Sequence, residues 1–374
     1  MSRYILGVSL ALVAVPAFAA DAGFVPMFNG KDLSGWVNVN CAPSTFFVKG
    51  EEVITTGRPT GYLRTAKQYE NFVLEVDWMH VNKKEVGNSG IFVWGDPLPA
   101  VGTGYTRGIE VQVLVNLTYK DKEGRVTASS HGDLFSIWGA HCTPDRPHPS
   151  GWERCLPSEN RAKGGGEWNH YKVTANDGVI KLEVNGKEVS GVSKCNPRKG
   201  YLALESEGAE CHFKNLSIKE LPSTNPKPEE CAKVDEGYVS LFDGLDLTGW
   251  RTGKDAWKVN DGVVKAAGKA ELATEKKFGP CELLFDCRMP AKSKAEWSVR
   301  LGTNRTYSFA NADVDGRGNW NRVVMTVGKD GVSQSVNGRP KGKSGEVPDT
   351  GPVAFAAAER LELRSIFLRE IKEK

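Results

Sequence analysis

The sequence predicts an all-β protein made of two tandem sandwich-like domains, the second shorter than the first. Short segments alternate between apolar and polar residues, and turns rich in Gly, Asn and Asp separate them. A block of the first half returns in the second half with its motifs in the same order. Beyond the N-terminal residues, no segment has the apolar periodicity of a three-turn helix.

The repeat opens with MFNGKDLSGW at residues 27–36, which returns as LFDGLDLTGW at 241–250. Trp168-Asn169 is then matched by Trp320-Asn321, and each copy continues with Asp-Gly-Val followed by Val-Asn-Gly. Matches in a consistent order indicate a tandem duplication. The residues between the copies are Pro-rich and polar, as is typical of a linker. We therefore expect a first domain at 24–221, a linker at 222–235 and a second domain at 236–374.

Residues 1–19 have the pattern of a bacterial signal peptide. Arg3 precedes a mostly apolar stretch, and Ala17-Phe18-Ala19 offers small residues at the two positions that a signal peptidase inspects. We expect cleavage after Ala19 and a periplasmic or secreted protein. No later segment is long and apolar enough to span a membrane. An even number of cysteines, 8, permits disulfides in an exported protein, and the first pairs to consider are Cys142 with Cys155 and Cys281 with Cys287.

The charge balance gives no indication of two classes of partner. The chain has 49 basic and 46 acidic residues, a net charge of +3. Because the positive and negative charges nearly cancel, the composition does not favour binding to nucleic acid or to an anionic membrane surface.

Carboxylate side chains lie on one face of three predicted strands. Alternation places Glu110 and Gln112 opposite Ile109, Val111 and Val113. Two more strands carry such a face, one with Glu75 and Asp77 and one with Glu205 and Glu207. If the three strands are neighbours, their polar faces form one acidic surface suited to acid–base chemistry or to a divalent cation. The same pattern is also typical of a solvated outer face.

The second copy serves as an internal control for these candidates. We expect it to lack the strand of Glu110, together with Asn88, His131-Gly132-Asp133 and the loop from Cys142 to Cys155. Near its end, Phe355-Ala356-Ala357-Ala358 answers Glu205-Ser206-Glu207-Gly208. Residues shared by both copies are then scaffold, and residues special to the first copy are site candidates. His131 and Asp133 could transfer protons, bind a metal or be structural, and Arg146 could form a wall of the site or belong to an ordered loop.

The order of several motifs resembles the 3-keto-disaccharide hydrolase family over about residues 24–221. These motifs are FNGKDLSGW, NSGIFVW, IEVQV, GEWNHYKV, VNGKEV and GYLALESEG followed by CHFKNLSIKEL. The resemblance implies a concanavalin A-like lectin/glucanase jelly roll, with a degenerate member of the family as the second copy. It also implies cleavage of glycosides oxidised at C3, by hydrolysis or by elimination at C1–C2 followed by hydration.

The resemblance assigns roles to residues of the first copy. Glu110 is the leading base or metal ligand, Glu207 is the second carboxylate, and His131 is a lower-ranked catalytic candidate. The candidates for substrate binding are Asn88, Gln112, Trp168, Glu205 and Arg146, and those for metal binding are Glu110, Asp133 and His131. The sequence makes no cofactor certain, although a divalent cation would serve to stabilise the enolate. Family members often have Gln at the position of Glu205, and many have His at that of Glu207.

Two functions remain open from the sequence. The first is an exported enzyme that cleaves 3-keto-glycosides by carboxylate acid–base catalysis. The alternative is a non-catalytic, lectin-like carbohydrate-binding protein of the cell envelope, because the same fold makes lectins. Both have a carbohydrate ligand, and neither involves nucleic acid or an integral membrane segment.

Overall fold

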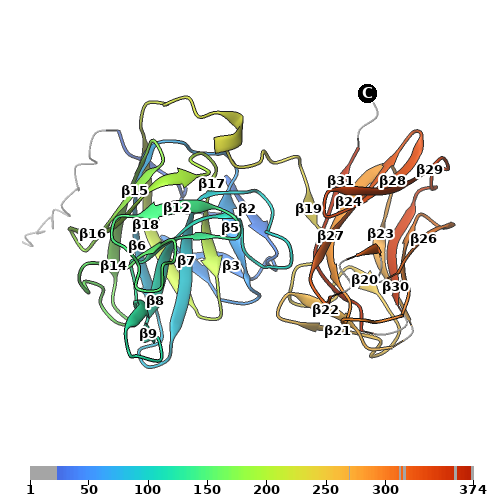
Figure 1. Ribbon diagram of the computed structural model, residues 1–374, viewed down its shortest axis with the longest axis horizontal. Helices are drawn as coiled ribbons and strands as arrows, with labels where there is room; N and C mark the ends of the chain where they lie inside the picture. Colours follow the sequence, from blue (N-terminus) through green and yellow to red (C-terminus); the bar gives the residue numbers. More distant parts are fainter. Residues whose placement is uncertain (1–22, 269, 311–312, 315–316, 358–359, 372–374) are drawn as a thin grey trace, which may run out of the picture.

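The computed structural model describes residues 23–268, 270–310, 313–314, 317–357 and 360–371. The predicted signal peptide, residues 1–19, lies outside the described residues. Within them the chain forms two β-sandwiches that lie side by side (Figure 1), which confirms the predicted fold class with its shortened second domain. No helix in the described part of the chain is long and apolar enough to cross a membrane.

The first domain consists of two large antiparallel sheets and a small hairpin. In spatial order, the nine-stranded sheet contains β12 (His141–Pro144), β16 (Lys187–Asn196), β15 (Val179–Val184), β14 (Asn169–Asn176), β6 (Phe72–His80), β18 (Cys211–Glu220), β4 (Glu52–Thr55) and β3 (Phe46–Lys49), with β1 (Val25–Pro26) paired to β18. The seven-stranded sheet contains β13 (Arg154–Cys155), β11 (Leu134–Ile137), β8 (Gly108–Val115), β7 (Gly87–Gly95), β17 (Tyr201–Ser206), β5 (Gly61–Thr65) and β2 (Trp36–Val39). The hairpin pairs β9 (Tyr119–Lys120) with β10 (Val126–Ala128).

The second domain repeats this plan with fewer strands. Its eight-stranded sheet contains β21 (Trp257–Asn260), β22 (Val263–Ala266), β31 (Glu362–Glu370), β24 (Cys281–Arg288), β27 (Asn321–Gly328), β28 (Gly331–Val336) and β29 (Arg339–Ser344), with β19 (Val239–Ser240) paired to β31. Its five-stranded sheet contains β20 (Trp250–Arg251), β23 (Ala270–Phe278), β30 (Gly351–Ala357), β25 (Trp297–Leu301) and β26 (Arg305–Phe309).

Comparison of the sheet orders corrects one expectation about the repeat. β25 and β26 occupy the places of β7 and β8, so the strand of Glu110 has a counterpart in the second copy. As far as the structure describes the second domain, the part without a counterpart is β9–β13. The register equates Glu110 with Thr306 and Gln112 with Ser308, because Ile91 and Val299 occupy equivalent core positions. It also equates Leu204 with Phe355, so the match of Phe355 to Glu205 is wrong by one residue and Glu205 corresponds to Ala356. The polar groups of the first copy were thus replaced on strands that remain.

Each sandwich has its own apolar core between its sheets. Alternation along the strands turns Trp78, Val111 and Tyr171 into the first core, and Phe285 and Trp297 into the second. The opening motif serves the same purpose in both copies. The indole nitrogen of Trp36 donates to the Met27 carbonyl at 2.9 Å, and that of Trp250 donates to the Leu241 carbonyl at 2.7 Å.

All eight cysteines are free thiols in the structure. Cys281 and Cys287 lie six residues apart on β24, which separates them by about 20 Å along an extended strand. The suggested bridge between them is therefore wrong. Cys142 and Cys155 lie on β12 and β13, which contact each other, and both thiols are buried.

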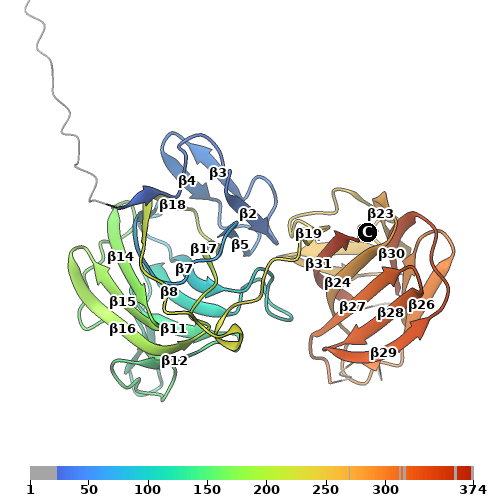
Figure 2. The same ribbon diagram turned by 90° about the horizontal axis from the view of Figure 1, so that it is seen from above.

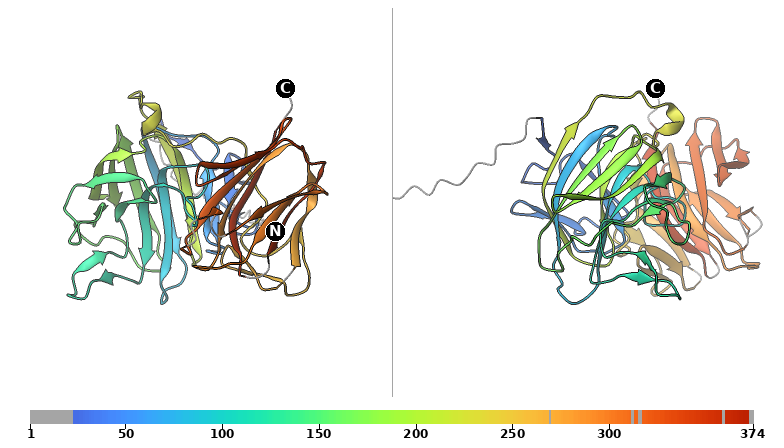
Figure 3. Two further views of the ribbon diagram at one scale, coloured as in Figure 1. Left: turned by 45° about the vertical axis from the view of Figure 1, so that its right-hand side comes forward. Right: turned by 60° about the vertical axis from the view of Figure 1, so that its left-hand side comes forward.

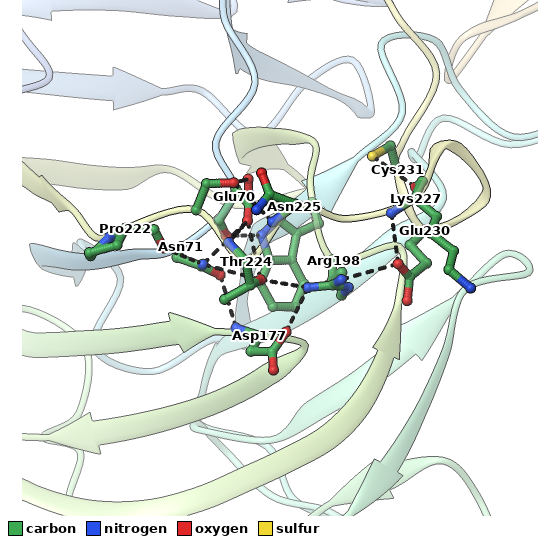
Figure 4. A network of polar contacts seen from close by, with 12 residues as sticks. Glu70, Asn71, Asp177, Arg198, Pro222, Thr224, Asn225, Lys227, Glu230 and Cys231 are labelled. Atoms are coloured by element: carbon green, nitrogen blue, oxygen red, sulfur yellow. Dashed lines mark hydrogen bonds and ion pairs between the residues drawn. The ribbon is translucent and has the colours of Figure 1, made fainter.

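The connection between the domains is held against the first domain. After β18 it crosses over that domain, with a short 3₁₀ turn at Pro228–Glu230, before it reaches β19 (Figures 1 and 3). Arg198 is the centre of the polar network that holds it, and binds Asp177 at 2.6 Å, Thr224 at 2.7 Å and Glu230 at 3.1 Å (Figure 4). This connection is an ordered strap and not a loose tether.

The second domain packs its eight-stranded sheet against the seven-stranded sheet of the first. Tyr62, Phe92 and Ala203 form one apolar cluster with Leu284 and Phe367. These first-domain residues project from the same face of their sheet as Glu110 and Glu205, because Phe92 pairs with Glu110 and Tyr62 with Glu205. The second domain therefore covers the β5 and β2 side of the face that carries these carboxylates.

Four polar residues of the second domain grip the loop between β7 and β8, which extends toward that domain (Figure 2). Arg322 donates to the carbonyl of Pro99 at 2.8 Å, and Arg364 donates to that of Gly102 at 3.0 Å. Asp286 accepts from the Gly102 amide at 2.9 Å, and Ser365 donates to the Thr103 carbonyl at 3.4 Å. We call Asp286, Arg322, Arg364 and Ser365 the loop clamp. Trp320 packs on Gly102 so closely that a Cβ there would lie 2.4 Å from the indole side chain.

Candidate active site

A cavity of about 410 Å³ lies on the open part of the seven-stranded sheet. Its floor includes a row of cross-strand neighbours, with Arg154 on β13 opposite Phe135 on β11, and Phe135 opposite Glu110 on β8. Other lining residues come from neighbouring strands and loops: Asn88, Tyr105, Gln112, Tyr119, Lys120, Thr127, Ala128, Trp138, Trp152, Glu205 and Glu207. Five predicted site residues therefore line one cavity: Glu110, Glu207, Asn88, Gln112 and Glu205.

Gly90 makes room for two of the carboxyl groups to meet. A Cβ at this position would lie 2.8 Å from Oε1 of Glu110 and 2.9 Å from Oε2 of Glu205. Any side chain on β7 here would displace one of them. The absence of a side chain at residue 90 thus allows carboxyl groups from β8 and β17 to approach each other across β7.

These carboxyl groups cannot all be ionised together. Burial and the nearby Glu207 carboxylate raise the pKa of Glu110 well above its usual 4.5. Burial and the Glu110 carboxylate do the same to the pKa of Glu205, which is 1% exposed and whose Oε2 lacks a conventional donor among the described residues. A proton on Glu205 allows its carboxyl group to donate to Glu207, which turns like-charge repulsion into a hydrogen bond.

Glu207 is the carboxylate that its surroundings hold in place. Tyr105 donates its hydroxyl to Oε1 at 2.8 Å, and Asn88 donates its amide to Oε2 at 2.5 Å. Burial raises the pKa of Glu207 more than these bonds lower it. Tyr105 itself stays a neutral donor because burial and the Glu207 charge raise its pKa.

A relay of hydrogen bonds connects Glu207 to the far side of the cavity. Arg154 donates to Gln112 at 3.2 Å, and Gln112 donates to Asn88 at 2.9 Å. Asp133, which is fully buried, fixes the guanidinium of Arg154 through a bond of 2.6 Å. The relay orients the N–H group of Gln112 toward Asn88 and that of Asn88 toward Glu207. Among the described residues, no side chain donates a hydrogen bond to Glu110, so its carboxyl group is available to a ligand.

The structure places three predicted site residues outside this cavity. His131 is 1% exposed, and its Nε2 accepts the backbone amides of Arg161 and Ala162. Arg146 donates to the carbonyls of Leu156 and Val189. Trp168 precedes β14 in the other sheet, where Lys214 lies 3.9 Å from its ring centre. These side chains satisfy buried or local groups of the scaffold.

Two expectations about the carboxylates change as well. Glu75 and Asp77 lie on β6 in the nine-stranded sheet, so they do not extend the acidic surface formed by β8 and β17. Asp133 supports Arg154 and does not face a ligand site.

In the described part of the chain, no group of three His, Cys, Asp or Glu side chains is arranged to hold a metal ion. Asp133 is paired and His131 already accepts two amides, so the suggested ligand set does not fit a cation.

Sequence reasoning missed nine of the residues that line the cavity, among them Tyr105, Trp138, Trp152 and Arg154. Tyr105 and Trp138 lie in loops without periodicity, and Trp152 lies in the Pro-rich loop that drew attention to Arg146. Arg154 could have been found, because it precedes the buried Cys155 in a short strand and alternation then directs it to the opposite face.

Replacing Glu205 with Gln should make the protein more stable at neutral and alkaline pH. The pKa of Glu205 is higher in the folded than in the unfolded chain, so the folded protein holds an extra proton above about pH 4.5. The free energy of unfolding of the wild type therefore falls as the pH rises from about 4.5 through the pKa of Glu205 in the folded protein. The Glu205→Gln variant carries no titratable group at this position, so it should not lose this stability. Urea unfolding at about pH 4 and pH 8 would measure it, with Glu75→Gln as the control. An equal destabilisation of Glu205→Gln at both pH values would contradict a protonated Glu205.

Comparison with known proteins gives one family and several distant structures. The model of the 3-keto-alpha-glucoside-1,2-lyase-like domain matches residues 23–219 and 237–308. Two structures of candidate glycosyl hydrolases from Parabacteroides distasonis ATCC 8503 are similar to this chain. The first is 22% identical in sequence with a TM-score of 0.41, over 54% of this chain and 94% of its own. The second is 19% identical with a TM-score of 0.39, over 53% of this chain and 99% of its own. A carbohydrate binding module from Bacillus subtilis is 14% identical with a TM-score of 0.36, over 51% of this chain and 98% of its own. No curated protein matches the chain significantly in sequence.

Proposed function

The chain belongs to the 3-keto-alpha-glucoside-1,2-lyase-like domain family, and from this premise we propose that its first domain cleaves 3-keto-glycosides by elimination across C1 and C2. The observation that carries the proposal is the cavity where Glu110, to which no described side chain donates, lies between Arg154 and the Glu205–Glu207 pair. Residues 1–19 support a site of action in the periplasm or outside the cell.

The first step is removal of the C2 proton. The ketone at C3 acidifies this proton, and the ionised Glu110 carboxylate accepts it. The electron pair of the broken C–H bond moves into an enolate on the C3 oxygen. Arg154, which lines the cavity and is fixed by Asp133, supplies positive charge to this oxygen. Gln112, held by Arg154 and Asn88, is placed to orient the sugar.

The second step is departure of the leaving group. The enolate returns its electron pair to form the C1–C2 double bond, and the C1–O bond breaks with its electrons on the leaving oxygen. That oxygen takes up a proton, and the proton shared by Glu205 and Glu207 is available in the same cavity. The product is a 2-hydroxy-3-keto-glucal, and addition of water across its double bond gives 3-keto-glucose. The overall result is hydrolysis.

Incubation of the mature protein with 3-keto-sucrose and with a 3-keto-β-glucoside in D₂O, followed by mass spectrometry, tests this function. We expect release of the glucal, or of 3-keto-glucose with one deuterium at C2, faster than in a sample without enzyme. Release without deuterium would indicate direct hydrolysis. Absence of product beside measurable glycan binding would favour the lectin-like alternative. A parallel sample with EDTA should keep its activity, because the ligand set does not fit a cation.

A further inference from the structure

A second cavity adjoins the first and is used by no step of the proposed reaction. It measures about 370 Å³ and shares Phe135, Trp138, Trp152 and Arg154 with the first cavity. Its own lining consists of Ser136, Gly139, Ala140, His141 and Glu153. Because four residues belong to both, the two cavities form one continuous groove, which we call the extended groove.

Two tryptophans stand at the junction with their rings open to solvent. Trp138 is 52% exposed and Trp152 is 53% exposed. Trp138 has a φ of 52°, a left-handed conformation that a bulky residue rarely adopts and that functional sites often retain. Its ring lies nearly parallel to that of Tyr105, with 6.5 Å between centroids. The exposure and the backbone strain both disfavour Trp138 in the free protein, which points to a ligand that covers it.

Trp152 is held in place by a buried histidine. The rings of His148 and Trp152 stack with 4.8 Å between centroids and 12° between planes. Nε2 of His148 lies 2.8 Å from the Thr127 carbonyl, and Nδ1 accepts the Ser150 amide. An exposed aromatic plane that is fixed in advance loses little conformational entropy on binding.

Polar groups lie beyond the two tryptophans. Glu153 accepts hydrogen bonds from Ser136 at 2.6 Å and from the Cys142 amide at 3.1 Å, and its side chain is 45% exposed. His141 lies beside it at 3.2 Å and is 70% exposed. Aromatic planes flanked by exposed hydrogen-bonding groups suit a pyranose, whose C–H face is apolar and whose rim carries hydroxyls.

The extended groove has one closed and one open end. Beyond the carboxyl groups, the second domain covers Tyr62 and Ala203, and Thr60 binds Asp261 of that domain at 3.2 Å. At the other end lies β13, the edge strand of the seven-stranded sheet. A chain of sugars that occupies both cavities can therefore extend past β13.

We propose that the second cavity binds the sugar on the leaving-group side, so that the enzyme removes a terminal 3-keto unit from an oligosaccharide. The 3-keto ring lies at the closed end over Glu110, the next pyranose stacks on Trp138 and Trp152, and further units extend past β13. This inference rests on the proposed function and defines its substrate class.

The test compares substrates of increasing length. Methyl 3-keto-β-glucoside fills only the first cavity, whereas 3-keto-cellobiose and 3-keto-cellotriose, oxidised at the terminal ring, also reach the second. Because Trp152 lines both cavities, we expect Trp152→Ala to raise KM for the two longer substrates about tenfold more than it raises KM for the methyl glycoside, with similar kcat changes for all three. Trp138→Ala should act in the same way. Trp168→Ala, which removes a tryptophan from the other sheet, should change neither constant.

Equal KM changes for all three substrates, or no preference of the wild type for longer ones, would overturn the inference. If no keto-substrate is cleaved, the proposed function fails separately. In that case, titration calorimetry with unoxidised cellotriose measures whether the extended groove binds a chain of sugars. Weaker binding by Trp152→Ala than by Trp168→Ala would support it, and equal binding would refute it.

Discussion

Replacing Glu110 with Gln should lower kcat on 3-keto-glycosides by about 10²–10⁴-fold, the usual contribution of a positioned base. Gln keeps the size of Glu and the hydrogen-bonding capacity of its uncharged form, but it cannot accept the C2 proton. KM should change little, because the other side chains of the cavity remain. In the wild type, the acid limb of the pH–rate profile should lie well above pH 4.5, because burial and the Glu207 charge raise the pKa of the base.

A suitable control is Glu75→Gln, a glutamate on β6 of the other sheet, which should keep full activity. Unfolding curves of both variants would separate a catalytic effect from a loss of fold. If the Glu110→Gln variant kept its kcat, or if the acid limb persisted in it unchanged, another group would have to accept the proton.

Replacing Asp286 with Ala should lower the free energy of unfolding by about 3–5 kcal/mol, as expected when a buried ion pair loses one member. Asp286 is fully buried and binds Arg322 through both oxygens, at 2.8 and 3.0 Å. Its removal leaves the guanidinium of Arg322 and the amide of Gly102 without this acceptor. Because the loop clamp holds the loop of Tyr105, which donates to Glu207, the variant should also lose activity.

The first copy contains a matched control for this variant. Asp77 occupies the equivalent position, since it pairs with His170 as Asp286 pairs with Arg322, but its side chain is 20% exposed and that of His170 is 43% exposed. Asp77→Ala should cost less than about 1 kcal/mol. Urea unfolding and limited proteolysis of residues 99–103 would measure both effects. If Asp286→Ala does not fold, Gly102→Ala tests the same contact from the loop side, and an unchanged loop in that variant would contradict the role of the clamp.

The sequence predicted the fold and part of the site for identifiable reasons. Alternation around Glu110 and Glu205 correctly separated core from polar residues, because a strand exposes its faces in turn. It could not say which sheet a strand joins, and so β6 was grouped with β8 and β17. The repeat predicted two domains because the same opening motif builds the same local structure in both copies. In each copy its tryptophan, Trp36 or Trp250, donates to a main-chain carbonyl at the start of the motif.

The remainder of the site depends on contacts that leave no periodic signal. Tyr105 reaches Glu207 from a loop, and its position is fixed by residues more than 180 positions away in the second domain. His131 and Arg146 have side chains of types that often act in catalysis or ligand binding, but in this structure they form hydrogen bonds with main-chain groups. Trp168 was predicted to bind substrate although the second copy retains it as Trp320, and it lies outside the cavity, beside Lys214.

The residues of the loop clamp also have counterparts in the first copy. Its members Asp286, Arg322, Arg364 and Ser365 correspond in register to Asp77, His170, Lys214 and Asn215, so one copy holds its neighbour head to tail. A head-to-tail contact of this kind can repeat without end and form filaments. In the second copy the connection from β25 to β26 spans only residues 302–304, so it offers no loop to a third copy. The contact between the copies is therefore one-sided, since the clamp in use lies on the second domain and the loop that it holds lies on the first.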